Sequence, residues 1–209
     1  MSCFYVWFAL IDPFKATYFK EETLGSIHKD TVYLTVVDKD QMAVSMIYSI
    51  FHSFGSGMAS KKFGINFQNR GAGFTLEKGH PNEAAGFKRP MHTIIPGILR
   101  QSDKFTMPFG VMGGAYQPNG HVRYMSNLVD FDMNIQEAID GPRSFYDNGD
   151  LMLERGYTNL VRDGLKNMGH KVEVPNSPIG GGQAIKINWE QGVLEGASDP
   201  RKDGCAIGY

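Results

Sequence analysis

The chain has 209 residues, a formal net charge of −1 at pH 7 and a pI near 6.6. Hydrophobic residues make up 42% of the sequence, which is enough for one ordinary core and argues against a disordered chain. Lysines and arginines are scattered rather than gathered in a patch. This charge pattern argues against nucleic acid and acidic membrane surfaces as partners.

The first 30 residues differ from the rest. An apolar run, CFYVWFALI at 3–11, lacks a basic leading region and a small-residue cleavage site, and it is too short to span a bilayer. We interpret it as a core or interface segment, with a degraded export signal as the alternative, so cytoplasm and periplasm both stay open. Cys3 and Cys205 lie near opposite ends without metal-ligand spacing, and both are expected to be free thiols.

A hairpin is predicted directly after this segment. Residues 31–37 alternate as a strand, residues 38–41 form a polar turn, and residues 43–51 form the return strand. This hairpin brings Thr31 and Ser49 within reach of each other. By itself, a threonine that opens a strand is usually only a β-branched residue in a suitable place.

The rest of the chain alternates between strand and helix signals. Period-2 patterns and glycine-rich joints predict strands at 63–68, 92–99, 107–112, 170–174, 184–189 and 193–198. One helix is predicted from an apolar face formed by Val122, Met125, Leu128 and Val129. Asn134 and Glu137 then have the spacing of a capping box, closed by Gly141. A further helix, whose apolar stripe is interpreted as core, ends at the left-handed cap Gly169 and carries Tyr157, Leu160, Val161, Leu165 and Met168.

No cofactor or metal site is expected. The glycines at 55–62 and 179–183 lack the spacing of a P-loop or a dinucleotide-binding loop. His80, His121 and His170 are too dispersed in the sequence for a zinc set.

Several blocks, in order along the chain, resemble the γ-glutamyltranspeptidase family of N-terminal-nucleophile hydrolases. They are DTVY at 30–33, VDKD at 37–40, FGSG at 54–57, and the blocks at 63–75, 86–96, 109–122, 130–143 and 196–209. The variants QNRG, KRPMHT and VMGGAYQP look more like the acylase-like branch than like the glutathione-cleaving members.

The resemblance implies an α+β fold, the four-layer αββα sandwich, of which this chain supplies only part. Residues 31–209 correspond to the small subunit, and residues 1–30 are a divergent remnant of the large-subunit end or a linker. The large-subunit half is therefore the expected protein partner. The family is not metal-dependent.

The resemblance also assigns the catalytic residues. Thr31 matches the nucleophile, which autoproteolysis between Asp30 and Thr31 converts to an N-terminus, and Ser49 matches a threonine that bonds the nucleophile. Gly113 and Gly114 match the oxyanion-hole pair. Without the resemblance, two glycines after a strand are usually only a turn.

The substrate pocket departs from the glutathione-cleaving pattern. Phe51 and Gly73 replace the asparagine and aspartate that hold the γ-glutamyl group, Arg70 replaces a glutamine, and His92-Thr93 replaces a serine pair. The aspartate that pairs with a substrate ammonium is lost, whereas Arg70 can hold a carboxylate. A structural ion pair is an equally good reading of Arg70, and a structural role is favoured for His92.

The sequence therefore predicts an N-terminal-threonine amidohydrolase or acyltransferase that acts on γ-glutamyl or glutaryl-type amides. The alternative is an inactive fragment or an assembly subunit. The retained set of Thr31, Ser49, Gly113 and Gly114 favours the enzyme.

Overall fold

The computed structural model describes residues 14–15 and 29–208, with residues 29 and 30 described by their backbone alone. The apolar run at 3–11 and Cys3 lie outside these residues. The expected boundary at residue 30 stays a prediction. The described residues form two compact units, one that includes residues 142–179 and another that includes residues 29–141 and 180–208.

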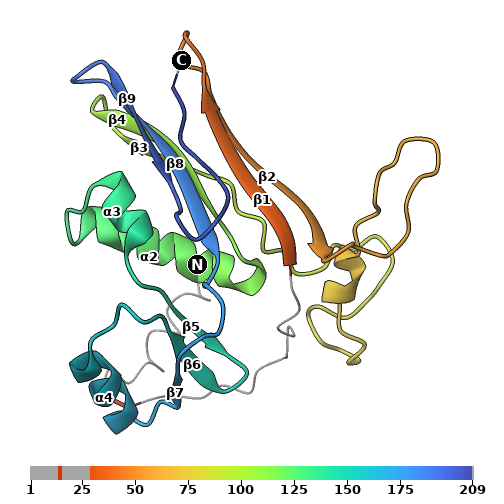
Figure 1. Ribbon diagram of the computed structural model, residues 1–209. Helices are drawn as coiled ribbons and strands as arrows, with labels where there is room; N and C mark the ends of the chain where they lie inside the picture. The colour runs from red at the N-terminus through yellow and green to blue at the C-terminus, as the bar shows by residue number, and fades with distance from the viewer. Residues whose placement is uncertain (1–13, 16–28, 209) are drawn as a thin grey trace. The chain divides into compact units, whose positions relative to one another are not determined.

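The larger unit contains two sheets (Figure 1). A two-stranded ribbon pairs β1 (Lys29–Val37) with β2 (Ala43–His52). A four-stranded antiparallel sheet has the order β3-β4-β8-β9, with bounds Gly97–Gln101, Phe105–Met112, Gly181–Asn188 and Val193–Ser198. Helices α2 (Gln117–Val129) and α3 (Ile135–Asp140) and short 3-10 turns η1 (Arg70–Gly73) and η2 (Gly114–Tyr116) complete it.

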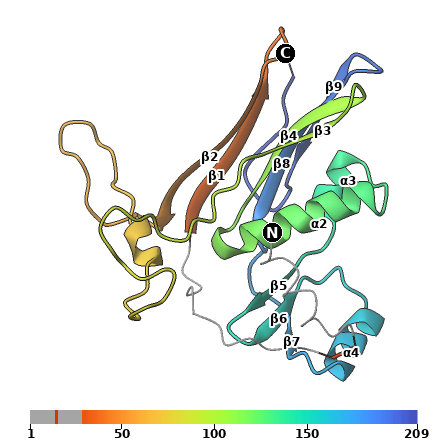
Figure 2. The same cartoon turned by 180° about the vertical axis from the view of Figure 1, so that it is seen from behind.

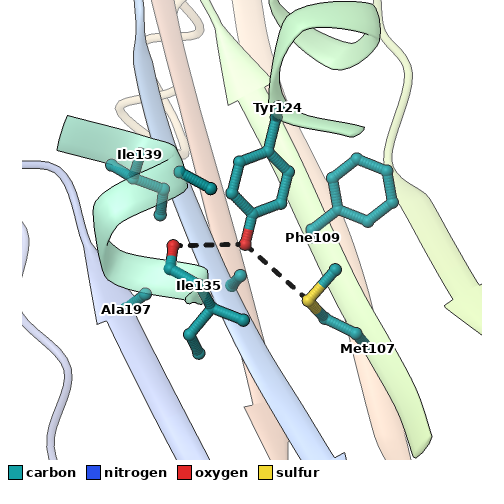
Figure 3. Close-up of a cluster of buried hydrophobic side chains, with 8 residues drawn as sticks. Met107, Phe109, Tyr124, Ile135, Ile139 and Ala197 are labelled. Carbon is teal, nitrogen blue, oxygen red and sulfur yellow. Dashed lines mark hydrogen bonds between the residues drawn. The ribbon is translucent and has the colours of Figure 1, made fainter. Parts of the chain in front are cut away.

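The core of this unit lies between the four-stranded sheet and the two α-helices. Met107, Phe109 and Val111 alternate along β4 and are buried, as the period-2 geometry of a strand requires for one covered face. Figure 3 shows Tyr124 of α2 beside Met107 and Phe109. Its hydroxyl donates to the carbonyl of Ile135 at 3.5 Å and contacts the sulfur of Met107 at 3.7 Å. The helices therefore cover one face of the sheet.

The β1–β2 ribbon packs on the other face (Figure 2). Gly110 of β4 lies under the ring of Tyr33, so close that a β-carbon on Gly110 would stand 2.3 Å from the ring. The Tyr33 hydroxyl lies 2.8 Å from Ser45 Oγ, and Ser45 Oγ donates to the carbonyl of Gly97 at 2.9 Å and lies 3.4 Å from that of Phe109. Apolar and polar contacts together fix the ribbon on the sheet.

The outward face of the ribbon is apolar and exposed. Its residues alternate with the inward ones and pair across the two strands: Val32 with Tyr48, Leu34 with Met46, and Val36 with Val44. All six are at least 36% exposed. An apolar patch of this extent on a strand pair is typical of a surface that another element covers.

The smaller unit contains a three-stranded sheet and one helix. Strands β5 (Ser144–Asp147), β6 (Asp150–Leu153) and β7 (Val172–Glu173) have the order β5-β6-β7. Helix α4 (Asn159–Asn167) begins after Thr158, whose side chain accepts from the N–H of Val161, and ends before Gly169 with φ +97°. The predicted helix and its glycine cap are confirmed.

Several strand predictions are confirmed and others are wrong. The hairpin, β4, β7, β8 and β9 form close to their expected bounds, but residues 63–68 form no strand and make only a single bridge, between Ala59 and Asn66. The strand expected at 92–99 begins only at Gly97, because residues 90–96 run as irregular chain. Strands β5 and β6 were not predicted.

The predicted apolar faces of two helices are also wrong. In α2, Val122 and Val129 are 72% and 67% exposed, while the buried positions are Gln117, Gly120, Tyr124 and Asn127. Gly120 is buried because its missing side chain admits Val111, and Asn127 because its amide donates to the carbonyl of Ala138 at 3.0 Å. The stripe of α4 is not core, since Leu160 is 84% exposed and no α4 residue is buried. The capping box of Asn134 and Glu137 is confirmed.

The contact of Tyr33 with Gly110 gives a test of the ribbon's packing. Gly110→Ala is expected to lower the free energy of unfolding by about 1–3 kcal/mol, because the new methyl group must displace a ring held by a hydrogen bond. Gly86→Ala is the matched control, since nothing lies within 4 Å of the added carbon and its backbone is ordinary. Urea unfolding followed by circular dichroism measures both. Equal midpoints for the two variants would contradict the packing described.

Candidate active site

The hairpin register places Thr31 directly opposite Ser49. Their hydroxyl oxygens are 3.0 Å apart, and both residues are half-buried on the inward face of the ribbon. The register shifts between Asp30 and Thr31, which is the irregularity of a β-bulge. Asp30 pairs with Phe51 and Thr31 with Ser49, so the extra residue of the bulge is Ile50, and β2 is the strand that bends beside the threonine.

The Ser49 hydroxyl has two further partners. The N–H of Phe51 donates to Ser49 Oγ at 3.1 Å, and Nη2 of Arg70 donates to it at 2.7 Å. The second distance is that of a charge-assisted hydrogen bond. Thr31, Ser49, Phe51 and Arg70 therefore form one connected group, although Arg70 is 39 positions from Thr31 in the sequence.

Arg70 is held from two sides. Its guanidinium lies over the Phe51 ring at 5.1 Å, a cation–π distance. The preceding residue, Asn69, accepts from the N–H of His52 at 3.1 Å, and its amide nitrogen lies 2.8 Å from Nδ1 of the same histidine. Burial lowers the pKa of Arg70, but the ordinary value for arginine is so high that the group stays charged at neutral pH.

Phe51 adopts a strained backbone conformation with φ +77°. This left-handed region is uncommon for a bulky side chain and costs about 1–3 kcal/mol. Here it turns the N–H of Phe51 onto Ser49 Oγ while its ring meets Arg70. Strain of this kind concentrates at functional sites, because the surrounding structure must maintain it.

Thr31 lies at the end of β4. In the packing of the ribbon on the sheet, Ser45 lies against Phe109 and Tyr33 against Gly110. Ser45 pairs with Thr35, so the ribbon lies against Phe109 at Thr35 and against Gly110 at Tyr33. The start of β1 therefore lies toward the end of β4. Figure 1 shows the start of β1 and the end of β4 at the same end of the two sheets.

Gly113 and Gly114 follow β4 directly, at φ +135° and +60°. A β-carbon on Gly113 would stand 2.9 Å from the α-carbon of Gly180, so only glycine fits. Both N–H groups lie in the turn that directly follows β4. Such donors, held in a fixed turn, are the groups that stabilise an oxyanion.

The other expected pocket residues lie in different environments. His92 is exposed, and its pKa is lowered by partial burial and then by the positive charges of Arg70 and Arg89. Thr93 is buried, and its hydroxyl is one of the buried polar atoms without a hydrogen bond in the described chain. Gly73, at the end of η1, is also buried. Only His92 of these three presents its side chain to solvent.

Gln117 is a site-supporting residue that the sequence did not indicate. It is completely buried at the start of α2. In the amide orientation that satisfies both groups, its nitrogen donates to the carbonyls of Thr93 at 2.7 Å and Val111 at 3.1 Å. It thereby ties the chain after His92 to the end of β4. A lone glutamine before Pro118 has no periodic or motif signal, so only tertiary structure reveals it.

The described residues contain no group of three or more histidine, cysteine or acidic side chains arranged to hold a metal. In the same part of the chain, no helix is both long and apolar enough to cross a membrane.

The sequence of this chain is similar to known proteins over most of its length. The gamma-glutamyltranspeptidase family model matches residues 9–209. The glutathione hydrolase-like YwrD proenzyme of Bacillus subtilis (strain 168) is 36% identical over 87% of this chain, and the oxamate amidohydrolase proenzyme of Klebsiella pneumoniae is 38% identical over 86%. The chain spans 36% of the length of each of these two relatives.

Solved structures show the same mixed arrangement of helices and sheets. The cephalosporin acylase of Bacillus halodurans is 38% identical with a TM-score of 0.77, over 85% of this chain and 34% of that one. The gamma-glutamyltranspeptidase of Pseudomonas nitroreducens, solved with L-DON, is 26% identical with a TM-score of 0.76, over 85% of this chain and 98% of that one. Sequence and fold agree over most of the chain, which belongs to the γ-glutamyltranspeptidase family.

Proposed function

We propose that this chain carries the catalytic part of an N-terminal-threonine hydrolase or acyltransferase, with Thr31 as the nucleophile. The observation that carries the proposal is the 3.0 Å contact between the hydroxyls of Thr31 and Ser49, at the end of the sheet that leads into Gly113 and Gly114. The relatives named as proenzymes support a step of chain cleavage.

The chemistry requires a base for the threonine proton. A free α-amine, with a pKa of about 7.7–8.0, can accept it near neutral pH, but this amine exists only after the bond between Asp30 and Thr31 is cut. In that cut, Thr31 Oγ1 attacks the carbonyl carbon of Asp30, the C–N bond breaks as the hydroxyl proton ends on the Thr31 nitrogen, and water hydrolyses the resulting ester, which restores the Thr31 hydroxyl. The Asp30 carboxylate and the Thr31 amine are then released.

Turnover repeats the same bond changes on an external amide. Thr31 Oγ1 bonds to the substrate carbonyl carbon and its proton passes to the α-amine, while the N–H groups of Gly113 and Gly114 stabilise the oxyanion. The proton then goes to the leaving amine as the C–N bond breaks. Water resolves the acyl ester in hydrolysis, and an acceptor amine resolves it in transfer.

Arg70 points to an acyl group that carries a carboxylate. One of its N–H groups already bonds Ser49, so the remaining donors of the fork lie beside the nucleophile. Phe51 and Gly73 offer no charge for a substrate ammonium. We therefore propose γ-glutamyl or glutaryl-type amides as substrates, with His92 at the edge of the pocket and Thr93 beneath it. The oxamate amidohydrolase named above also takes an amide with a carboxylate.

The exposed apolar face of the ribbon supports a large-subunit partner. A helical layer over β1 and β2 would complete an αββα sandwich around the two sheets of the larger unit. We propose that residues 31–209 act as the small subunit, that residues 1–30 belong to the end of the large-subunit region, and that the large-subunit half supplies this layer.

Cleavage between Asp30 and Thr31 is the first test. The parent chain, expressed with a large-subunit half from a relative, is expected to give a fragment that begins at Thr31, measured by intact-protein mass spectrometry. Thr31→Ala should prevent both cleavage and turnover, whereas Thr31→Ser should retain part of each because serine keeps the hydroxyl and the amine. A folded but uncut parent would instead support the inactive assembly subunit.

A pair of substrates tests the pocket. The p-nitroanilides of glutaric acid and γ-glutamate differ only by the α-amine, which Phe51 and Gly73 cannot pair. Their kcat/KM values are expected to agree within about tenfold. Preference for the γ-glutamyl compound above about a hundredfold, near 2.7 kcal/mol, would show that another group binds the ammonium. Thr31→Ala gives the background rate.

The proximity of His92 to Arg70 has a pH consequence. Because Arg70 disfavours the imidazolium of His92, Arg70→Met should raise the pKa of His92 toward its ordinary value, with burial and Arg89 still holding it below. NMR titration of the imidazole measures the shift. Lys39→Met, at the distant β1–β2 turn, is the control and should leave this pKa unchanged. An unchanged pKa in Arg70→Met would place Arg70 away from the pocket edge.

A further inference from the structure

The direction of the hydrogen bond between Ser49 and Thr31 follows from counting protons and lone pairs on Ser49 Oγ. A serine hydroxyl has one proton to donate and two lone pairs to accept. Two N–H groups already point at this oxygen, from Phe51 at 3.1 Å and from Arg70 Nη2 at 2.7 Å. Both lone pairs are occupied, so the bond to Thr31 at 3.0 Å must use the proton of Ser49.

We infer that Arg70 is a positioning residue for the nucleophile, acting through Ser49. The guanidinium and the N–H of Phe51 together fix the rotation of the Ser49 hydroxyl and aim its proton at Thr31 Oγ1. The positive charge of Arg70 also polarises that O–H bond, which makes Ser49 a stronger donor to the threonine oxygen. This inference rests on the proposed role of Thr31 and gives Arg70 a task besides holding a substrate carboxylate.

These hydrogen bonds determine where the proton of Thr31 can go during attack. As Thr31 Oγ1 forms its bond to a carbonyl carbon, its own proton cannot pass to Ser49, whose oxygen has no lone pair left. In turnover that proton passes to the α-amine of Thr31. Ser49 and Arg70 keep all their protons and act only by stabilising the negative charge that develops on the threonine oxygen.

Three local features make the arrangement rigid. The positive φ of Phe51 directs its N–H at Ser49, its ring supports the guanidinium, and the Asn69–His52 pair anchors the chain beside Arg70. A neutral amide at position 70 would offer N–H groups but no charge. An Arg70→Gln variant, whose side chain is also two atoms shorter, should therefore lose the polarisation.

Self-cleavage gives a test that involves no substrate carboxylate. The full chain, under the conditions in which the parent is cut, is compared with Arg70→Met, Ser49→Ala and the double variant, and the first-order rate is followed by intact mass. Each single variant is expected to cleave about ten- to hundredfold more slowly. The double variant should be no slower than Ser49→Ala, because Arg70 has no effect once the serine hydroxyl is gone.

Two further readouts separate positioning from folding and from substrate binding. Arg70→Lys should regain part of the rate lost in Arg70→Met, since an ammonium can donate to Ser49 with its charge, and Arg70→Gln should regain less. Butyryl p-nitroanilide, which has no carboxylate, should lose the same factor as self-cleavage in Arg70→Met. The matched control is Arg89→Met, an exposed arginine that also lowers the pKa of His92 and should leave both rates unchanged.

Four outcomes would overturn the inference. The first is self-cleavage of Arg70→Met at the parental rate, and the second is a double variant whose rate falls by the product of the two single losses. The third is an Arg70→Lys variant that cleaves no faster than Arg70→Met. The fourth is a loss in Arg70→Met that appears only with carboxylate-bearing substrates. All four leave the role of Thr31 intact. Absence of cleavage in the parent would instead remove the proposed function, and this inference with it.

Discussion

The packing of the β1–β2 ribbon on β4 is the constraint on which the site depends. Gly110 lacks a side chain, so the Tyr33 ring can lie on the strand, and the Tyr33 hydroxyl ends on Ser45, which in turn donates to a carbonyl of β3. Burial raises the pKa of Tyr33, so the phenol stays neutral and its hydrogen bond is kept. With Tyr33 fixed, Thr31 lies two residues away along a strand, at about 3.3 Å per residue.

The two faces of the ribbon have different compositions for a physical reason. The inward face carries hydroxyl side chains at Thr31, Thr35, Ser45 and Ser49, which are short enough to lie near the sheet and can each find a partner. The outward face is apolar along its length. Because the side-chain period of a strand is two, a slip of one residue would exchange the faces and lose both the packing and the contact between Thr31 and Ser49.

The sequence was sufficient where local rules determine structure. The alternation of side chains predicted the hairpin and which residues share one of its faces, so the pair of Thr31 and Ser49 could be predicted. The Asn134–Glu137 capping box and the Gly169 cap follow from backbone hydrogen-bonding rules. It failed where tertiary contacts decide. Gln117 is buried because two carbonyls need its amide, and a pattern of apolar residues cannot indicate this.

The same limit applies to the pocket. The sequence left Arg70 with two equal interpretations, a partner for a substrate carboxylate or a structural ion pair. Its bond to Ser49 accompanies the left-handed turn at Phe51, which no propensity rule gives to a phenylalanine. The strand expected at 63–68 does not form for a related reason. Its apolar and polar residues alternate, but no neighbouring strand lies beside it to pair with beyond the single bridge between Ala59 and Asn66.

If Thr31 is the nucleophile, one guanidinium beside it links two properties that are usually set by separate groups. Arginine has five donors in a fixed fork, so one edge can hold Ser49 while another meets a substrate carboxylate. Glutamine, which stands here in the glutathione-cleaving pattern, has two donors and no charge. In the proposed mechanism, a change from glutamine to arginine at position 70 alters the preferred acyl group and the polarisation of Thr31 together. A carboxylate bound in this way would also partly neutralise the charge that polarises Ser49, so acyl groups that bind Arg70 most tightly would gain the least activation of Thr31.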